Sequence, residues 1–110
     1  MEVSNYWKVY EFHKAFEQPT PSIEEPTNFD DKLGQFRLDL IYEEYNELKH
    51  AINTNNFVEI RDALADILYV VYGTAVSYGI QVDPLFFEKY SEPKYLGLNL
   101  SNFQILYEKI

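Results

Sequence analysis

The sequence contains no cysteine, and it has only nine basic residues against 18 acidic ones. Without cysteine there is no disulfide scaffold, no thiolate zinc site and no cysteine nucleophile. The net charge of −9 disfavours general nucleic-acid binding, because an acidic surface repels the phosphate backbone. The N-terminus lacks the pattern of a signal peptide, and the longest apolar run, 67–80, is too short for a transmembrane helix and is interpreted as a buried core helix. We therefore expect a soluble, cytoplasmic protein with no membrane or nucleic-acid partner.

The residues that are present predict a single all-α domain over 1–110. Hydrophobic residues make up 46% of the chain and aromatic residues 17%, which is enough for a packed core. Capping residues, prolines and apolar periodicity predict four to five helices in a bundle. The link between the second and third helices is short and polar, which predicts an antiparallel helical hairpin at the centre of the fold. The expected helices span residues 4–17, 28–53, 55–79, 83–90 and 101–110.

Acidic residues interrupt the apolar face of the second expected helix. At about 100° per residue, Glu44 and Glu47 fall within 40° of Leu40, in the middle of the apolar stripe, and Glu43 lies on its flank. A solvated surface would place its acids opposite the apolar residues. Folding alone therefore does not explain why acidic residues occupy these positions.

The third expected helix repeats this anomaly. Asp66 is the only charged residue from 63 to 80, in a helix that is apolar nearly all round and is therefore expected to be buried. An isolated ionised carboxylate in such an interior costs at least several kcal/mol, so Asp66 must be paired, neutral or bound to a cation. Asp62 lies on the same side, one turn earlier. Arg37 lies on the Leu40 face, where it could reach Glu44, Glu47 or a substrate phosphate, but one arginine cannot balance four acids.

Clustered carboxylates without thiols favour hard, oxygen-loving cations, namely Mg²⁺ or Mn²⁺. Simpler explanations remain for each part of the pattern. An EExxE segment is commonly a solvated helix face, and a tyrosine hydroxyl or Arg37 could satisfy Asp66. His13 is most simply a partly buried polar residue. The aromatic excess fits a core or an interface, although Trp7, Tyr10 and Phe12 could also form a wall on which a base stacks.

The motifs resemble those of a known enzyme superfamily. Residues 37–48 read RLDLIYEEYNEL, residues 62–75 read DALADILYVVYGTA, and 9–13 read VYEFH. Together they resemble the all-α nucleoside triphosphate pyrophosphohydrolases, which include MazG, the dimeric dUTPases and phosphoribosyl-ATP pyrophosphohydrolase. The resemblance is strongest over residues 6–82 and to the small, phage-type MazG-like members, whereas 83–110 diverges.

The resemblance implies a set of metal ligands. The superfamily signature is ExxE on one helix followed by ExxD on the next, and Glu44 and Glu47 match its first half. Asp66 matches the final Asp, but Ala63 stands at the Glu position. Asp62 is the available substitute. The metal ligands implied are Glu44, Glu47, Asp62 and Asp66. Glu59 is a further, less direct candidate.

The resemblance also implies an activity, which is Mg²⁺-dependent hydrolysis of a nucleoside triphosphate to its monophosphate and pyrophosphate, with Mn²⁺ as a substitute. Glu43 is the candidate that orients or deprotonates the attacking water. Arg37 is the first candidate for substrate binding, followed by Lys89, Lys94 and Tyr69. The implied assembly is a homodimer or homotetramer that completes the bundle. The alternatives are phosphoribosyl-ATP hydrolysis and a non-catalytic, acidic helical module that binds a protein.

Overall fold

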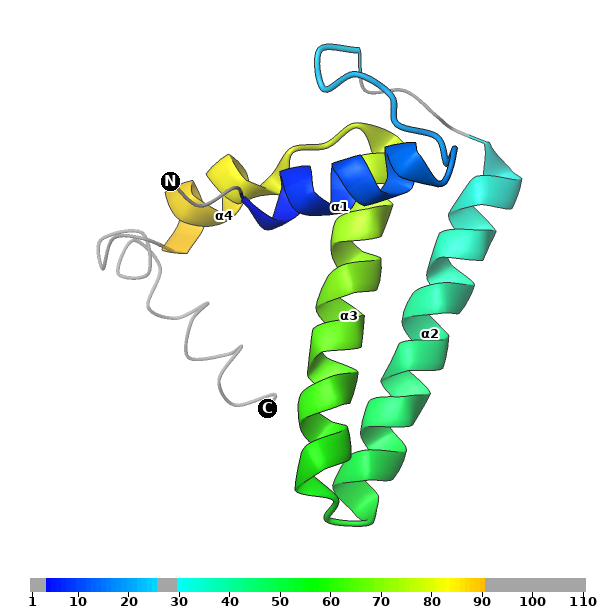
Figure 1. Cartoon of the computed structure of the whole chain (residues 1–110), viewed down its shortest axis with the longest axis vertical. Coiled ribbons are helices and arrows are strands. Elements are labelled where there is room, and N and C mark those ends of the chain that lie inside the picture. The colour runs from blue at the N-terminus through cyan, green and yellow to red at the C-terminus, as the bar shows by residue number, and fades with distance from the viewer. Residues whose placement is uncertain (1–3, 26–29, 91–110) are drawn as a thin grey trace. The chain divides into compact units, whose positions relative to one another are not determined.

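The computed structural model describes residues 4–25 and 30–90 of the chain. These residues form four helices and no strand, so the all-α prediction is confirmed (Figure 1). The expected segment at 101–110 lies outside the described residues. The helices are α1 (Asn5–Ala15), α2 (Asp31–Asn53), α3 (Phe57–Tyr78) and α4 (Val82–Tyr90).

Short polar side chains begin the first three helices. Ser4 accepts a hydrogen bond from the Trp7 backbone N–H, and Asn56 accepts one from Glu59 at 3.1 Å. Asp30 caps α2 by accepting from the Lys32 N–H at 2.8 Å. Each bond satisfies a backbone donor that has no partner inside the helix. The predicted starts of α1 and α3 are therefore confirmed, whereas α2 begins at Asp31, later than expected.

Two chain-local features end α3 and start α4. Gly79 has φ of 69°, a left-handed conformation that glycine adopts without steric cost, and it ends α3 as predicted. The fourth expected helix, with Asp83 as its cap, starts too late: α4 already begins at Val82, and Asp83 lies inside its first turn. The Gln81 side-chain oxygen instead accepts a hydrogen bond from the Asp83 N–H at 2.8 Å.

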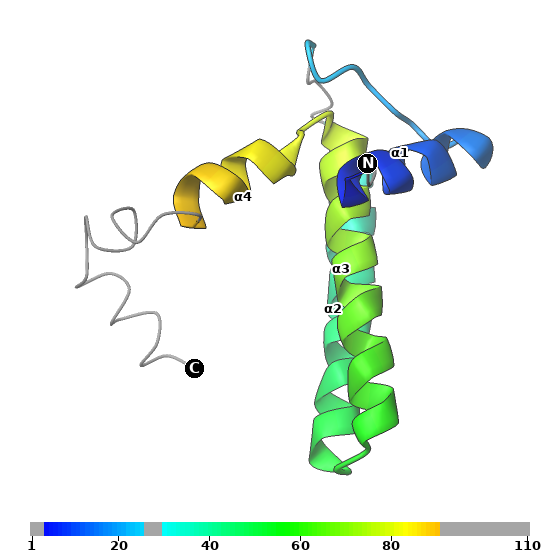
Figure 2. The same cartoon turned by 60° about the vertical axis from the view of Figure 1, so that its left-hand side comes forward.

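Helices α2 and α3 form the predicted antiparallel hairpin; they lie side by side in Figure 1, and α3 lies in front of α2 in Figure 2. The chain reverses through Thr54 and Asn55, and Asn55 has φ of 52°, a conformation that asparagine tolerates better than most residues. Helix α1 packs across α3 near the far end from this turn. It buries Tyr6, Val9 and His13, which share one helical face.

The hydrophobic core formed by α1, α2 and α3 is small, and much of α3 is exposed. Tyr6 and Val76 are fully buried, whereas Leu64 and Leu68 are 48% and 57% exposed. The expectation that α3 is buried all round is therefore wrong for the single chain. A helix with apolar residues on every side needs neighbours on every side, and α1 and α2 cover only part of α3.

The chain divides into two compact units, Met1–Ile80 and Gln81–Ile110. The boundary lies next to residue 82, where the motif resemblance weakens. Among the described residues no single helix is long and apolar enough to cross a bilayer. Helices α3 and α4 pass that test only when taken together, by length and composition alone.

Candidate metal and substrate site

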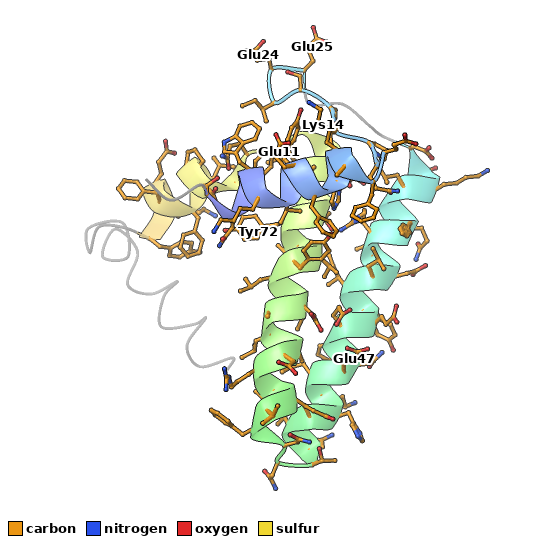
Figure 3. All side chains as sticks on the ribbon, in the orientation of Figure 1. Glu11, Lys14, Glu24, Glu25, Glu47 and Tyr72 are labelled. Carbon is orange, nitrogen blue, oxygen red and sulfur yellow. The ribbon has the colours of Figure 1, made fainter. Side chains whose placement is uncertain are left out.

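Three carboxylates converge between α2 and α3. Glu44 and Glu47 lie one turn apart on α2, and Asp66 faces them from α3. One oxygen from each side chain lies within 4.8 Å of the other two. We call these three residues the acidic cluster. Glu24 and Glu25, in contrast, are exposed surface groups that project from the loop after α1 (Figure 3).

Within the acidic cluster, Glu44 lies in the environment least favourable to a charged carboxylate. Its side chain is half-buried, and its Oε2 atom is enclosed and has no hydrogen-bond partner among residues 4–25 and 30–90. Burial is the largest cause that raises the pKa of Glu44; a side-chain hydrogen bond with Glu47 and the negative charges of Glu47, Asp66 and Glu43 raise it further. A carboxylate that lies among like charges and has one enclosed, unpartnered oxygen is stabilised by a bound cation. All three donors are carboxylate oxygens, which fit Mg²⁺ or Mn²⁺.

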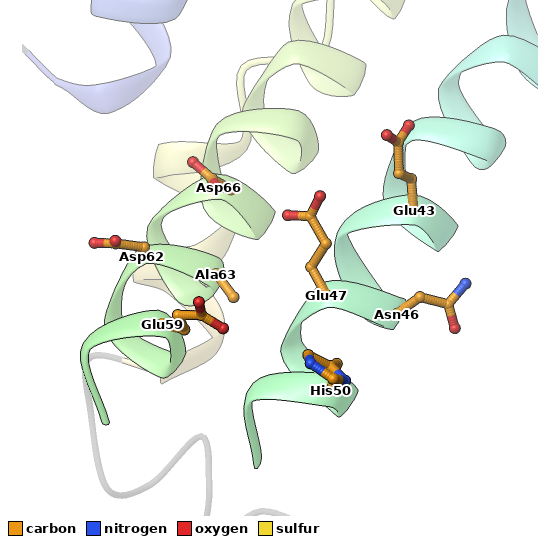
Figure 4. Close-up of a pocket in the computed structure, with 8 residues that line it drawn as sticks. All are labelled: Glu43, Asn46, Glu47, His50, Glu59, Asp62, Ala63 and Asp66. Atoms are coloured by element: carbon orange, nitrogen blue, oxygen red, sulfur yellow. The ribbon is translucent and has the colours of Figure 1, made fainter. Parts of the chain in front are cut away.

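A pocket of about 510 Å³ opens beside the acidic cluster (Figure 4). We call it the acidic pocket. Glu47 extends from α2 toward α3, whereas Asp62 points away from α2. The residues that line the acidic pocket are Glu43, Asn46, Glu47, His50, Glu59, Asp62, Ala63 and Asp66.

The structure separates the candidate ligands into two groups. Glu44, Glu47 and Asp66 come together, while Asp62 and Glu59 lie on the wall of the acidic pocket outside the cluster. Asp66 is itself exposed, so the inference that it sits in an apolar interior is wrong. It opens to solvent because the face of α3 that carries it lines the pocket.

Arg37 is buried, with 7% of its surface exposed, and it is bonded to α3. Its Nε donates to Thr74 Oγ1 at 3.1 Å, and its Nη2 donates to the Val70 carbonyl at 2.9 Å. The helical-wheel suggestion that it reaches Glu44 or Glu47 is therefore not what the side chain does. Gly73 makes this approach possible, because a Cβ there would lie 2.5 Å from Nη2.

A second pocket, of about 340 Å³, lies among α1, α2, α3 and the loop after α1. We call it the aromatic pocket. Arg37 and Tyr69, two of the residues predicted to bind substrate, line it together with Glu44 of the acidic cluster. Its remaining lining residues are Phe12, His13, Phe16, Gln18, Leu40 and Val70.

The other substrate-binding candidates cannot be placed at these pockets. Lys89 lies on α4, in the second unit, and Lys94 is outside the described residues. Of the three rings suggested as a stacking wall, Phe12 lines the aromatic pocket, whereas Trp7 and Tyr10 do not.

Several lining residues were missed by sequence reasoning. Asn46 and His50 share the pocket-facing side of α2 with Glu43 and Glu47, at helical spacing, and this periodicity was the available signal. Phe16 and Gln18 carry no such signal, because they reach the aromatic pocket only through the packing of α1 on α3. His13 was expected to be a partly buried polar residue, and it is 5% exposed.

Comparison with known proteins supplies the family. The model of the phosphoribosyl-ATP pyrophosphohydrolase family matches residues 9–89. The chain is also similar to uncharacterized protein L479 of Acanthamoeba polyphaga mimivirus, at 44% identity over 84 residues. That alignment covers 74% of this chain and 34% of the viral protein, so the chain spans about a third of that relative's length.

The matched span contains α2, α3 and all three members of the acidic cluster, as well as both pockets. The all-α fold agrees with the family assignment. The chain therefore belongs to the phosphoribosyl-ATP pyrophosphohydrolase family, within the MazG-like, all-α nucleoside triphosphate pyrophosphohydrolases.

Proposed function

We propose that this protein is a Mg²⁺-dependent pyrophosphohydrolase that converts a nucleoside triphosphate into its monophosphate and pyrophosphate. The observation that carries the proposal is the acidic cluster, in which three carboxylate oxygens from two helices lie within 4.8 Å of one another. Family membership supports a pyrophosphohydrolase and leaves the nucleotide open.

The acidic cluster supplies the metal ligands in this proposal. Glu44, Glu47 and Asp66 would hold the ion, and it would give the enclosed Glu44 oxygen a partner that the described residues do not provide. Asp62 and Glu59, on the wall of the acidic pocket, are the candidates for holding a second ion. Bound Mg²⁺ or Mn²⁺ neutralises phosphate oxygens and charge that develops in phosphoryl transfer.

Glu43 is the proposed general base. It lines the acidic pocket, one position before Glu44, and it is exposed to the water that must attack. The carboxylate accepts a proton as the water oxygen bonds to the α-phosphorus. The bond from the α-phosphorus to the bridging oxygen of the β-phosphate breaks, and pyrophosphate leaves with that oxygen.

We also propose that the active form is a homodimer or homotetramer. Leu38 on α2 is 62% exposed, and Leu64 and Leu68 on α3 are 48% and 57% exposed. Apolar side chains of this size, exposed along adjacent helices, are typical of a surface that another chain covers. A second copy would supply the neighbours that α3 lacks.

A second candidate function is hydrolysis of phosphoribosyl-ATP itself, which is the reaction named by the matched family. It uses the same acidic cluster and the same bond cleavage. The two candidates differ in the group that occupies the rest of the site, so a substrate panel that includes phosphoribosyl-ATP separates them.

The test is pyrophosphate release from that panel with Mg²⁺ or Mn²⁺. Glu47→Gln and Asp66→Asn should each lower kcat/KM by more than about 100-fold, the upper end of what loss of an outer-shell partner costs at a metal site. The matched control is Asp39→Asn, which removes an exposed carboxylate of α2 that bonds only to Gln35 and lies outside both pockets.

Two results would count against the proposal. One is a wild-type protein that releases no pyrophosphate from any nucleotide. The other is equal turnover in wild type, Glu47→Gln and Asp66→Asn. Calorimetry that also found no Mg²⁺-dependent nucleotide affinity would favour the non-catalytic binding module instead.

A further inference from the structure

The aromatic pocket presents rings to whatever enters it. Phe12 and Phe16 are 51% and 64% exposed although they line a pocket, and their ring centroids are 4.8 Å apart. Tyr69 meets Phe12 edge to face, with centroids 5.8 Å apart. Exposed rings around a concave site are suited to binding a flat, aromatic ligand.

Arg37 gives this pocket a fixed positive group. Its bonds to Thr74 and the Val70 carbonyl use Nε and Nη2, so Nη1 keeps both N–H donors free of the residues that the structure describes. Within residues 4–25 and 30–90 no carboxylate forms an ion pair with this guanidinium, which is instead near the Phe36 ring. A buried cation without an acidic partner favours a ligand that presents oxygen acceptors.

His13 adds polarity to the wall without adding charge. Burial is the main cause that lowers the pKa of His13, and the nearby Arg37 lowers it further, so the imidazole is neutral at pH 7. Its Nδ1 is enclosed and finds no partner in the described part of the chain, while its Nε2 side lies against Gly73. The pocket therefore combines rings, one neutral imidazole and one cation.

Glu44 connects the aromatic pocket to the metal ligands. It lines this pocket and also belongs to the acidic cluster, whose other two members line the acidic pocket. A ligand whose phosphates are held at the acidic cluster therefore has the aromatic pocket next to it. A nucleoside triphosphate has this form, with a flat ring at one end and phosphates at the other.

We propose that the aromatic pocket binds the base of the nucleotide, and that Arg37 makes it prefer a base with a carbonyl oxygen at C4 of a pyrimidine or C6 of a purine, namely uracil, thymine or guanine. This inference rests on the proposed function. Phe12 and Phe16 stack on the base, and the free Arg37 N–H groups donate to a carbonyl oxygen. Guanidinium groups bond in this way to carbonyl-bearing base edges. Cytosine and adenine carry an amino group at that position, which is itself a hydrogen-bond donor and cannot accept from the Arg37 N–H groups.

The test measures binding by calorimetry in the presence of Mg²⁺, with α,β-imido analogues that cannot be hydrolysed at the α,β bond. The probes are α,β-imido-dUTP, α,β-imido-dCTP and inorganic tripolyphosphate, which has no base. Wild type should bind the uracil analogue about tenfold or more tightly than the cytosine analogue, within the range of one good base contact. Phe12→Ala should weaken the uracil analogue about tenfold, as expected for the loss of base stacking, and should leave tripolyphosphate unchanged.

Phe57→Ala is the matched control, because Phe57 is a 71% exposed ring at the end of α3 far from α1 and lines neither pocket (Figure 1). It should leave all three affinities unchanged. Phe12 is itself half exposed, so its removal should not prevent folding. Phe16→Ala provides a second variant with the same expectation.

The outcomes separate the two proposals. If Phe12→Ala and Phe16→Ala leave the uracil analogue unaffected, or weaken tripolyphosphate equally, the aromatic pocket is not the base site. Equal or reversed affinity for the uracil and cytosine analogues refutes the role given to Arg37. Absence of pyrophosphate release from every nucleotide refutes the proposed function itself, and it is measured independently with hydrolysable substrates.

Discussion

Gly73 allows two helices to hold a buried guanidinium, and replacing it with alanine tests that arrangement. An added Cβ would lie 2.5 Å from Arg37 Nη2 and 3.0 Å from His13 Nε2. The first distance is too short to keep, so Nη2 must move away. That movement breaks its 2.9 Å hydrogen bond to the Val70 carbonyl.

The expected effect follows from two opposing contributions. Alanine inside a helix is about 1 kcal/mol more favourable than glycine. A hydrogen bond from a charged group contributes about 1.5–3 kcal/mol, and its loss here leaves a buried donor unsatisfied. The lost bond therefore outweighs the helix gain, and Gly73→Ala should lower the free energy of unfolding by about 0.5–2 kcal/mol.

Gly34→Ala is the matched control on α2. Of the described residues, a Cβ at Gly34 would meet the Tyr78 hydroxyl alone, at 3.0 Å, and this is the far end of a side chain that can turn aside. The helix gain should dominate there, so this variant should be as stable as wild type or more stable by up to about 1 kcal/mol.

The assay is urea unfolding followed by far-UV circular dichroism at one fixed protein concentration, because association would change the apparent stability. The reasoning is refuted if Gly73→Ala is as stable as Gly34→Ala or more so. That result would mean that the Arg37 and His13 side chains can move away from the new Cβ without lowering the free energy of unfolding.

Two further predictions concern charge and assembly. Because burial and its acidic neighbours raise the pKa of Glu44 above 4.5, the folded state holds that proton more tightly than the unfolded state. The contribution of Glu44 to the free energy of unfolding should therefore be greatest below pH 4.5 and should fall as pH rises through the raised pKa, by at most about 1.4 kcal/mol per pH unit for one proton. Urea unfolding without divalent cations should show a shallower fall for Glu44→Gln, and identical profiles would contradict this. In sedimentation, the mass of wild type should exceed the 13.0 kDa of one chain. Leu68→Glu should shift the mass toward that of one chain, because it places a charge on the exposed apolar surface. A wild-type species of 13.0 kDa at micromolar concentration would contradict the proposed assembly.

Local chemistry explains which parts of the fold were predictable. Ser4, Asn56 and Gly79 act within a few residues of their own positions, so the sequence is sufficient to identify them as helix ends. The side of α2 that carries Glu44 and Glu47 likewise follows from helical periodicity alone.

Features that depend on contacts between helices were not predictable in the same way. Asp62 and Asp66 differ by only about 40° around α3, so periodicity could not decide which one meets the acids of α2. Arg37 bonds to a carbonyl and a hydroxyl of α3, and neither partner stands out in a sequence. The exposure of Leu68 depends on how much of α3 the other helices cover, which no property of α3 determines.

The close spacing of the three cluster acids along the chain has a consequence for folding kinetics. Glu44, Glu47 and Asp66 all belong to one hairpin, which a short turn closes. Closing a short loop costs little chain entropy, and contacts between sequence neighbours form quickly. Repulsion among the three carboxylates opposes closure, so divalent cations should speed refolding of the hairpin. The protein would then acquire its metal while it folds, before the slower packing of α1 completes the aromatic pocket.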